Sequence, residues 1–268
     1  MDNAQVVALA QAGDRAAIDQ LVRDTKDLVY NLAVRMLGNP ADAEDATQEI
    51  LLKIVTHLDA FRGDSAFRTW AYRVAANHLL TARKRGAERR ADSLEQLGDE
   101  LLSHLPHGEP AIEDRLLLEE AKLICSSTML AVLERDLRIA FILGEVLELA
   151  SDEAAAILEV TPEAFRKRLS RARDRMASFT GKTCGLVDEA NPCRCGKQAR
   201  FAVDAKLVDP TCLVWQGHER RHVAAGRERI AAIDTLGKAI EVFRSHPEYI
   251  APGTLVAGVQ RALAGHEF

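Results

Sequence analysis

The sequence predicts an all-α protein with two small helical domains, an acidic linker between them and a mainly helical C-terminal extension. Apolar residues recur every three or four positions along much of the chain, which is the spacing of a buried helix face. Asn-Pro and Thr-Pro pairs stand where helices would begin. A chain of 268 residues also exceeds what one hydrophobic core usually organises. We therefore expect about two domains and a third, smaller unit.

The composition is typical of an ordinary globular protein, with 47% hydrophobic and 28% charged residues. No uncharged apolar run approaches the roughly 18 residues that a membrane crossing needs. The first residues, Met1-Asp2-Asn3-Ala4, lack the basic and then apolar order of a signal peptide. We therefore expect a cytoplasmic protein without membrane contact, and in that reducing compartment five cysteines argue against a disulfide framework.

Residues 1–90 are predicted to form the first domain. Asn39-Pro40 is a helix-start signal, because Asn caps free amides and Pro fits the first helical turn. The apolar positions that follow predict a helix of roughly 17 residues with one buried stripe. That stripe consists of Ala43, Ala46, Ile50, Leu51, Ile54, Val55 and Leu58. The polar residues that lie off it are Asp42, Glu44, Asp45, Gln48 and Glu49.

A loop at residues 61–65 is expected to precede a second buried-faced helix that begins near Phe67. Residues expected off its buried stripe are Arg68, Tyr72, Arg73 and Asn77. The helix leads into a basic block at residues 83–90, where five cations face one acid for a net charge of +4. Such a block can contact phosphates locally although the whole chain is acidic.

Residues 91–112 are predicted to be an acidic linker, because Gly, Pro and acidic residues increase there and the apolar periodicity fades. We expect this linker to be extended. Its acidity continues into the next segment, so that residues 92–120 carry nine acids and one arginine, a net charge of -8.

Residues 113–179 are predicted to form the second domain, which ends in a helix-turn-helix. Ser151 and Thr161 are expected to be N-caps of two helices separated by a short break at Glu159-Val160. The second helix should bury Phe165, Leu169, Ala172 and Met176. Its outer face should present Arg166, Lys167, Ser170, Arg171 and Arg173. A second helix with a basic outer face is typical of helices that enter the DNA major groove.

Residues 180–268 form a C-terminal extension that contains most of the cysteines and should be mainly helical. Candidate metal ligands are Cys184, Cys193, Cys195, Cys212, His218 and His222. These thiols and imidazoles could supply a zinc site, although their spacing is not the paired Cys-x-x-Cys of a strong zinc signal. A thiol redox switch and ordinary cysteines are the alternatives.

Several motifs of the first two domains resemble the sigma-70 family of bacterial RNA polymerase sigma factors. Residues 27–85 resemble region 2 of that family, and residues 113–179 resemble region 4. The motifs that carry the resemblance are 37–39, 42–49, 61–63, 67–77 and 168–173. Their order and the acidic linker match the extracytoplasmic function (ECF) group, so the chain resembles an ECF factor with a cysteine-containing extension.

The resemblance implies a promoter-specificity subunit that has no catalytic activity and requires no cofactor. Its expected partners are core RNA polymerase and promoter DNA, with a separate anti-sigma factor as a further candidate. The implied polymerase-binding residues are Asp42, Glu44, Asp45 and Gln48. The implied readers of the -10 element are Arg62, Asp64, Ser65, Tyr72, Arg73, Asn77 and Arg83. The implied binders of the -35 element are Arg166, Lys167, Ser170, Arg171 and Arg173.

Two other readings remain at this point. The chain could be a self-contained helix-turn-helix regulator whose extension senses metal or oxidant, but this leaves the acidic face of the first domain unexplained. It could also be a thiol oxidoreductase around Cys193 and Cys195, although no alternation of strands and helices surrounds them. If the chain is a sigma factor, we expect its extension to modulate promoter or polymerase binding from within the same chain.

Overall fold

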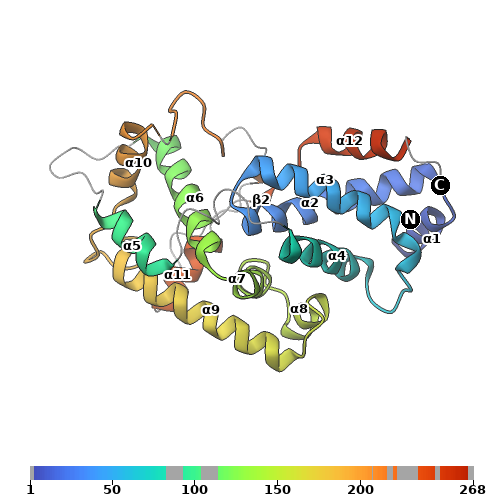
Figure 1. Cartoon of the computed structure of the whole chain (residues 1–268), viewed down its shortest axis with the longest axis horizontal. Helices are drawn as coiled ribbons and strands as arrows, with labels where there is room; N and C mark the ends of the chain where they lie inside the picture. Colours follow the sequence, from blue (N-terminus) through green and yellow to red (C-terminus); the bar gives the residue numbers. More distant parts are fainter. Residues whose placement is uncertain are drawn as a thin grey trace.

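The computed structural model describes residues 3–82, 93–103, 114–206, 208–215, 220–221, 235–244 and 248–264. In these ranges the chain is predominantly helical, which confirms the all-α prediction. One short antiparallel ladder pairs β1 (Arg220–Arg221) with β2 (Glu248–Tyr249). Figure 1 shows an elongated molecule, with the first helices at one end and α5, α6, α9 and α10 at the other.

The first lobe contains the helices of the predicted first domain. They are α1 (Asn3–Gln11), α2 (Arg15–Leu37), α3 (Pro40–Thr56), the short η1 (Leu58–Ala60) and α4 (Phe67–Thr81). Gly38 ends α2 in the left-handed region at φ 66°, and its N–H donates to the Val34 carbonyl at 2.8 Å. Asn39 then caps α3 by accepting from the Asp42 N–H at 3.0 Å. The predicted start and length of α3 are confirmed.

The second lobe contains the predicted helix-turn-helix. Its elements are α6 (Arg115–Val132), α7 (Arg135–Phe141), the π-helical turn η3 (Ile142–Val146), α8 (Ser151–Ile157) and α9 (Pro162–Thr183). Thr161 caps α9 as predicted, because its hydroxyl accepts from the Ala164 N–H at 3.1 Å. The prediction for Ser151 is wrong by one position, since Ala150 is the N-cap of α8 and no side chain caps that helix.

The linker contains a helix, so the expectation of an extended segment is wrong for residues 93–103. This helix, α5 (Leu94–Ser103), buries Leu94 and Leu97 against α9. Gly98 allows the close approach, since a Cβ there would lie 3.3 Å from the Phe179 ring. The two buried leucines at helical spacing outweigh the acidic character of the segment, because α9 provides a surface that covers them. Residues 104–113 lie outside the described ranges.

Two arginines connect the lobes. Arg138 is 2% exposed and donates to the carbonyl of Met36 at 2.5 Å, while it also donates to Leu133 at 2.8 Å. Arg135 donates to the carbonyl of Leu80 at 3.0 Å, at the end of α4. Buried apolar residues of both lobes belong to one continuous hydrophobic cluster. The two lobes are therefore docked against each other.

The extension returns along the molecule and contacts both lobes. It comprises α10 (Cys195–Asp204), α11 (Thr235–Arg244) and α12 (Gly253–Ala264). Helix α10 packs on α6, α11 packs on α9, and α12 packs on α3 and α2. Figure 1 shows α12 lying along α2 and α3, far from α10. No helix of the described residues is long and apolar enough to span a bilayer.

Candidate functional site

The acidic face of α3 is arranged as the sequence predicted, but it is partly covered. Asp45 is exposed, whereas Asp42, Glu44 and Gln48 are half-buried. They project from a helix whose opposite stripe enters the core. Helix α12 packs on α3 at Gln48, where a Cβ added to Gly258 would lie 3.0 Å from Gln48 Oε1. The extension therefore lies on one of the four residues of this face.

The loop between η1 and α4 is held by three aromatic rings. The centroids of Phe61 and Phe67 are 5.5 Å apart in an edge-to-face arrangement, and Trp70 lies 5.6 Å from Phe61. This cluster leaves Arg62 and Asp64 exposed, with Ser65 half-buried beside them. Glycine fits the turn between them, since Gly63 has φ 80°. The loop thus presents the polar side chains of Arg62, Asp64 and Ser65 next to a cluster of aromatic rings.

Tyr72 does not lie on the outer face of α4, so that expectation is wrong. Its side chain is 2% exposed and packs between α4 and the first-lobe core, with the Arg68 guanidinium 5.5 Å above its ring. Burial raises the pKa of the Tyr72 hydroxyl. On the same helix, Asn77 is exposed as predicted. Arg83 lies outside the described residues.

Arg73 faces the second lobe. Helix α8 packs against α4, and Arg73 Nη1 lies 3.8 Å from Glu159 Oε1. Glu159 is in the break between α8 and α9, with φ 53°. The α4 surface that carries Arg73 therefore contacts the helix-turn-helix directly.

The outer face of α9 is basic and accessible, as the apolar spacing predicted. Phe165, Leu169, Ala172 and Met176 are buried. Arg166, Lys167, Ser170 and Arg171 are exposed on the other side. Lys167 forms an i,i+4 ion pair with Glu163, with 2.8 Å between Nζ and Oε1. The other basic side chains of this face keep its net charge positive.

Arg173 differs from its neighbours because it is bound to a buried carboxylate. Its Nε donates to Glu145 Oε1 at 2.5 Å, and Glu145 is 3% exposed. Arg244 of α11 donates to the same residue, from Nε to the main-chain carbonyl at 2.8 Å. The sequence analysis did not identify Glu145. The signal was available, because Glu145 is a single acid among the apolar residues Ile142, Leu143 and Val146. A carboxylate in such a segment is buried and needs charged or hydrogen-bonding partners.

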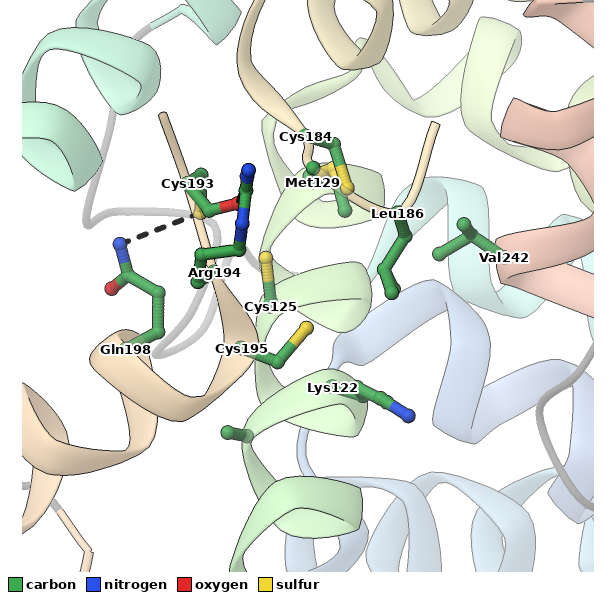
Figure 2. A pocket seen from close by; sticks show the side chains of 12 residues that line it. Lys122, Cys125, Met129, Cys184, Leu186, Cys193, Arg194, Cys195, Gln198 and Val242 are labelled. Carbon is green, nitrogen blue, oxygen red and sulfur yellow. Dashed lines mark hydrogen bonds between the residues drawn. The ribbon is translucent and has the colours of Figure 1, made fainter. Parts of the chain in front are cut away.

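Three of the predicted metal-ligating cysteines line one pocket, and a fourth cysteine that the sequence analysis did not include joins them. Cys184, Cys193 and Cys195 line the pocket together with Cys125 of α6 (Figure 2). Cys212 is exposed and does not line it, while His218 and His222 lie outside the described residues. Across the described ranges, no group of three His, Cys, Asp or Glu residues is arranged to hold a metal ion as it stands.

Comparison with known proteins decides the family. Family models for "Sigma-70 region 2" and "Sigma-70, region 4" match residues 21–90 and 125–176. The RNA polymerase sigma-H factor of Pseudomonas aeruginosa is 33% identical over 177 residues, an alignment that covers 63% of this chain and 89% of that protein. The chain belongs to the sigma-70 family, in its ECF group.

A second relative agrees with this assignment. The ECF RNA polymerase sigma-E factor of Escherichia coli K12 is 34% identical over 174 residues, covering 63% of this chain and 89% of that factor. The solved structure of CnrH in complex with the cytosolic domain of CnrY is 25% identical, covers 66% of this chain and 95% of its own, and has a TM-score of 0.47.

Family membership confirms the function expected from the motifs. This sigma factor is a transcription initiation factor that binds core RNA polymerase and directs it to promoter DNA. For the two matched regions, this function replaces the reading as a self-contained regulator. Both family models end before residue 180, so the extension lies beyond the matched regions.

Proposed function

We propose that the acidic face of α3 binds the core polymerase through Asp42, Glu44, Asp45 and Gln48. The observation that supports this is a helix with one stripe fixed in the core and carboxylates held on the side away from it. Carboxylates in a fixed arrangement provide a complementary surface for a basic partner, which sets encounter rate and register.

The promoter contacts come from the loop before α4 and from α9. Arg62, Asp64, Ser65 and Asn77 are accessible for reading an unstacked -10 base, and Arg73 joins them when α8 moves away. Arg166, Lys167, Ser170 and Arg171 form the surface for the -35 duplex. Arg173 positions α9 on Glu145 rather than contacting bases, because its guanidinium is engaged there.

The docked arrangement of the lobes is an inactive one. Elements centred at positions -10 and -35 are about 25 base pairs apart, which is roughly 85 Å at 3.4 Å per base pair. In the structure Arg73 and Glu159, one from each lobe, lie only 3.8 Å apart. Simultaneous contact with both elements therefore requires α4 and α8 to separate.

The extension maintains this arrangement and competes with polymerase. Its segments are attached to both lobes, with Arg244 on Glu145 in the second and Tyr249 on Asn31 in the first. Its last helix covers Gln48. The extension therefore performs within the chain the masking that a separate anti-sigma factor would perform from outside. The protein acts in the cytoplasm, with the polymerase and the chromosome.

Charge reversal tests the two binding surfaces. Asp45→Arg is expected to weaken core polymerase binding by about tenfold or more, because a cation would then face a basic partner. Arg171→Glu should leave that binding unchanged and reduce run-off transcription from the cognate promoter. Matched controls are Asp24→Arg and Arg23→Glu, both exposed on α2. Full polymerase affinity and transcription in both site variants would refute the assignment.

Removal of the last helix tests the role of the extension. A chain that ends at Pro252 is expected to bind core polymerase more tightly than the full chain, since Gln48 is then uncovered. Binding can be followed by fluorescence anisotropy of labelled sigma factor, with circular dichroism to verify that the helical content remains. Equal or weaker polymerase binding by the shortened, folded chain would contradict the masking role.

A further inference from the structure

The fold brings four cysteines from distant parts of the chain to one pocket. Cys125 lies in the middle of α6, Cys184 is the C-cap of α9, Cys193 lies in the loop that follows, and Cys195 is the first residue of α10. All four line the same pocket, together with Lys122 and Arg194 (Figure 2). Met129, Leu186 and Val242 also line it. The four thiols are free.

The loop is built to hold two of these cysteines opposite each other. Cys184 and Cys193 form an isolated parallel bridge, in which Gly185 N–H donates to the Cys193 carbonyl at 3.1 Å. Asn191 donates its side-chain amide to the carbonyl of Cys184 at 3.1 Å and so closes the turn. A Cβ on Gly185 would collide with the Cys193 carbonyl, so only glycine fits there. Bridged residues of a parallel pair direct their side chains to the same face.

The electrostatics of the pocket show that the thiols influence one another. Burial raises the pKa of Cys125 well above its ordinary value, and the neighbouring Cys193, Cys184 and Cys195 raise it further. Burial also raises the pKa of Cys195, to about 11. Near neutral pH the thiols of Cys125 and Cys195 are therefore protonated when no metal is bound. Four thiolates at this place need a compensating positive charge, of which Lys122 and Arg194 supply a part.

We propose that Cys125, Cys184, Cys193 and Cys195 form a tetrathiolate site for Zn²⁺ or another thiophilic d¹⁰ cation. Four cysteine sulfurs are the ligand set that such a cation takes in closed, tetrahedral structural sites. Binding converts four thiols and one divalent cation into a complex of charge -2 and releases four protons to solvent. Lys122 and Arg194 on the pocket wall complement that remaining negative charge.

Ligation requires the cysteine side chains to rearrange. The sulfurs are not yet in a metal-holding arrangement among the described residues. Each cysteine side chain has one rotatable bond to its sulfur, so rotation about Cα–Cβ changes where the sulfur points. Cys212, the remaining cysteine of the chain, is exposed and does not line the pocket. The ligand set that we propose therefore takes Cys125 from the second lobe in place of Cys212.

The site would join the extension to the helix-turn-helix lobe. Cys125 belongs to α6, whereas Cys193 and Cys195 lie at the start of the extension. Val242 of α11 lines the same pocket. A bound cation would therefore fix α10 against α6 and hold the beginning of the extension in place.

Metal analysis of the full-length protein tests the proposal. We expect the protein, purified under reducing conditions without chelator, to carry about one equivalent of a d¹⁰ metal by plasma mass spectrometry. Co²⁺ in place of Zn²⁺ should give the absorption spectrum of a tetrahedral thiolate site. Cys125→Ser is expected to lose the bound equivalent, whereas the matched control Cys212→Ser should retain it. Retention by folded Cys125→Ser, or loss in Cys212→Ser, would overturn the assignment.

A second measurement avoids the folding of variants. In the wild-type protein, Zn²⁺ should protect four cysteines from alkylation by N-ethylmaleimide and leave Cys212 reactive, as identified by peptide mass spectrometry. Chelation should increase the labelling of Cys125, Cys184, Cys193 and Cys195 together. Labelling that does not respond to Zn²⁺ would contradict the metal site. A Cys184–Cys193 disulfide in protein freshly purified under reducing conditions would contradict it as well.

Discussion

Gly258 of α12 packs against Gln48 of α3, with no side chain of its own between the two helices. Leu255 and Val259 flank it and are buried at 4% and 0% exposure. The contact joins the end of the extension to the polymerase-binding face that we propose. Glycine at this point brings the helix backbones together, and a long side chain cannot be accommodated without displacing Gln48 or the helix.

Gly258→Arg should therefore uncover α3 in the full-length chain. We expect this variant to bind core polymerase several-fold more tightly than the wild type, because α12 is displaced while the rest of the extension remains. Ala257→Arg is the matched control, since it places the same side chain on the exposed side of α12. Anisotropy titrations with core polymerase measure both. An unchanged affinity for Gly258→Arg would show that α12 does not compete.

Arg138 should contribute strongly to stability. Its guanidinium is buried and donates to the carbonyls of Met36 and Leu133, so Arg138→Ala leaves buried acceptors without donors. Each such loss costs about 1–3 kcal/mol, and we expect the free energy of unfolding to fall by about 3 kcal/mol. Urea denaturation measures it. Arg115→Ala, at a side chain that is 87% exposed, should change it by about 0.5 kcal/mol or less.

Two ion pairs made by arginines of α9 should differ in coupling energy because their acidic partners differ in burial. Arg173 pairs with Glu145, which is 3% exposed, whereas Arg175 pairs with Glu134, which is 61% exposed, at 2.8 Å. Double-mutant cycles with Gln substitutions should give a coupling energy of about 1 kcal/mol or more for the first pair and about 0.5 kcal/mol or less for the second. Equal coupling energies would mean that Glu145 is more solvated than its burial indicates.

The metal-free protein should lose stability in alkaline solution through Cys195. Burial raises the pKa of Cys195 from 9.0 to about 11, so between these values the unfolded chain loses a proton that the folded chain keeps. The unfolded state then binds fewer protons, and the free energy of unfolding falls as the pH rises from about 9 to about 11. Cys195→Ser should make this decline shallower. Parallel declines in chelator-treated wild type and variant would contradict the raised pKa.

Individual helices could be predicted because their signals are local. Asn39 and Thr161 cap the residues that immediately follow them, and the buried positions of α9 repeat within one or two turns. Tyr72 shows the limit of predicting burial from local helical spacing. It was assigned to the outer face of α4, but α2, α3 and α8 all pack on this helix, and the Tyr72 side chain is buried. Helical spacing defines a stripe, and the neighbouring helices decide how wide the buried stripe is.

The sequence by itself determined the capped helices α3 and α9, the basic face of α9, the acidic face of α3 and the family motifs. These depend on hydrogen bonds and apolar spacings that span only a few residues. Only the tertiary structure brought Cys125 to the cysteines of the extension, Glu145 to two arginines and Gly258 to Gln48. Those pairings join residues far apart in the chain, and they arise from the packing of whole helices, on which local spacing carries no information.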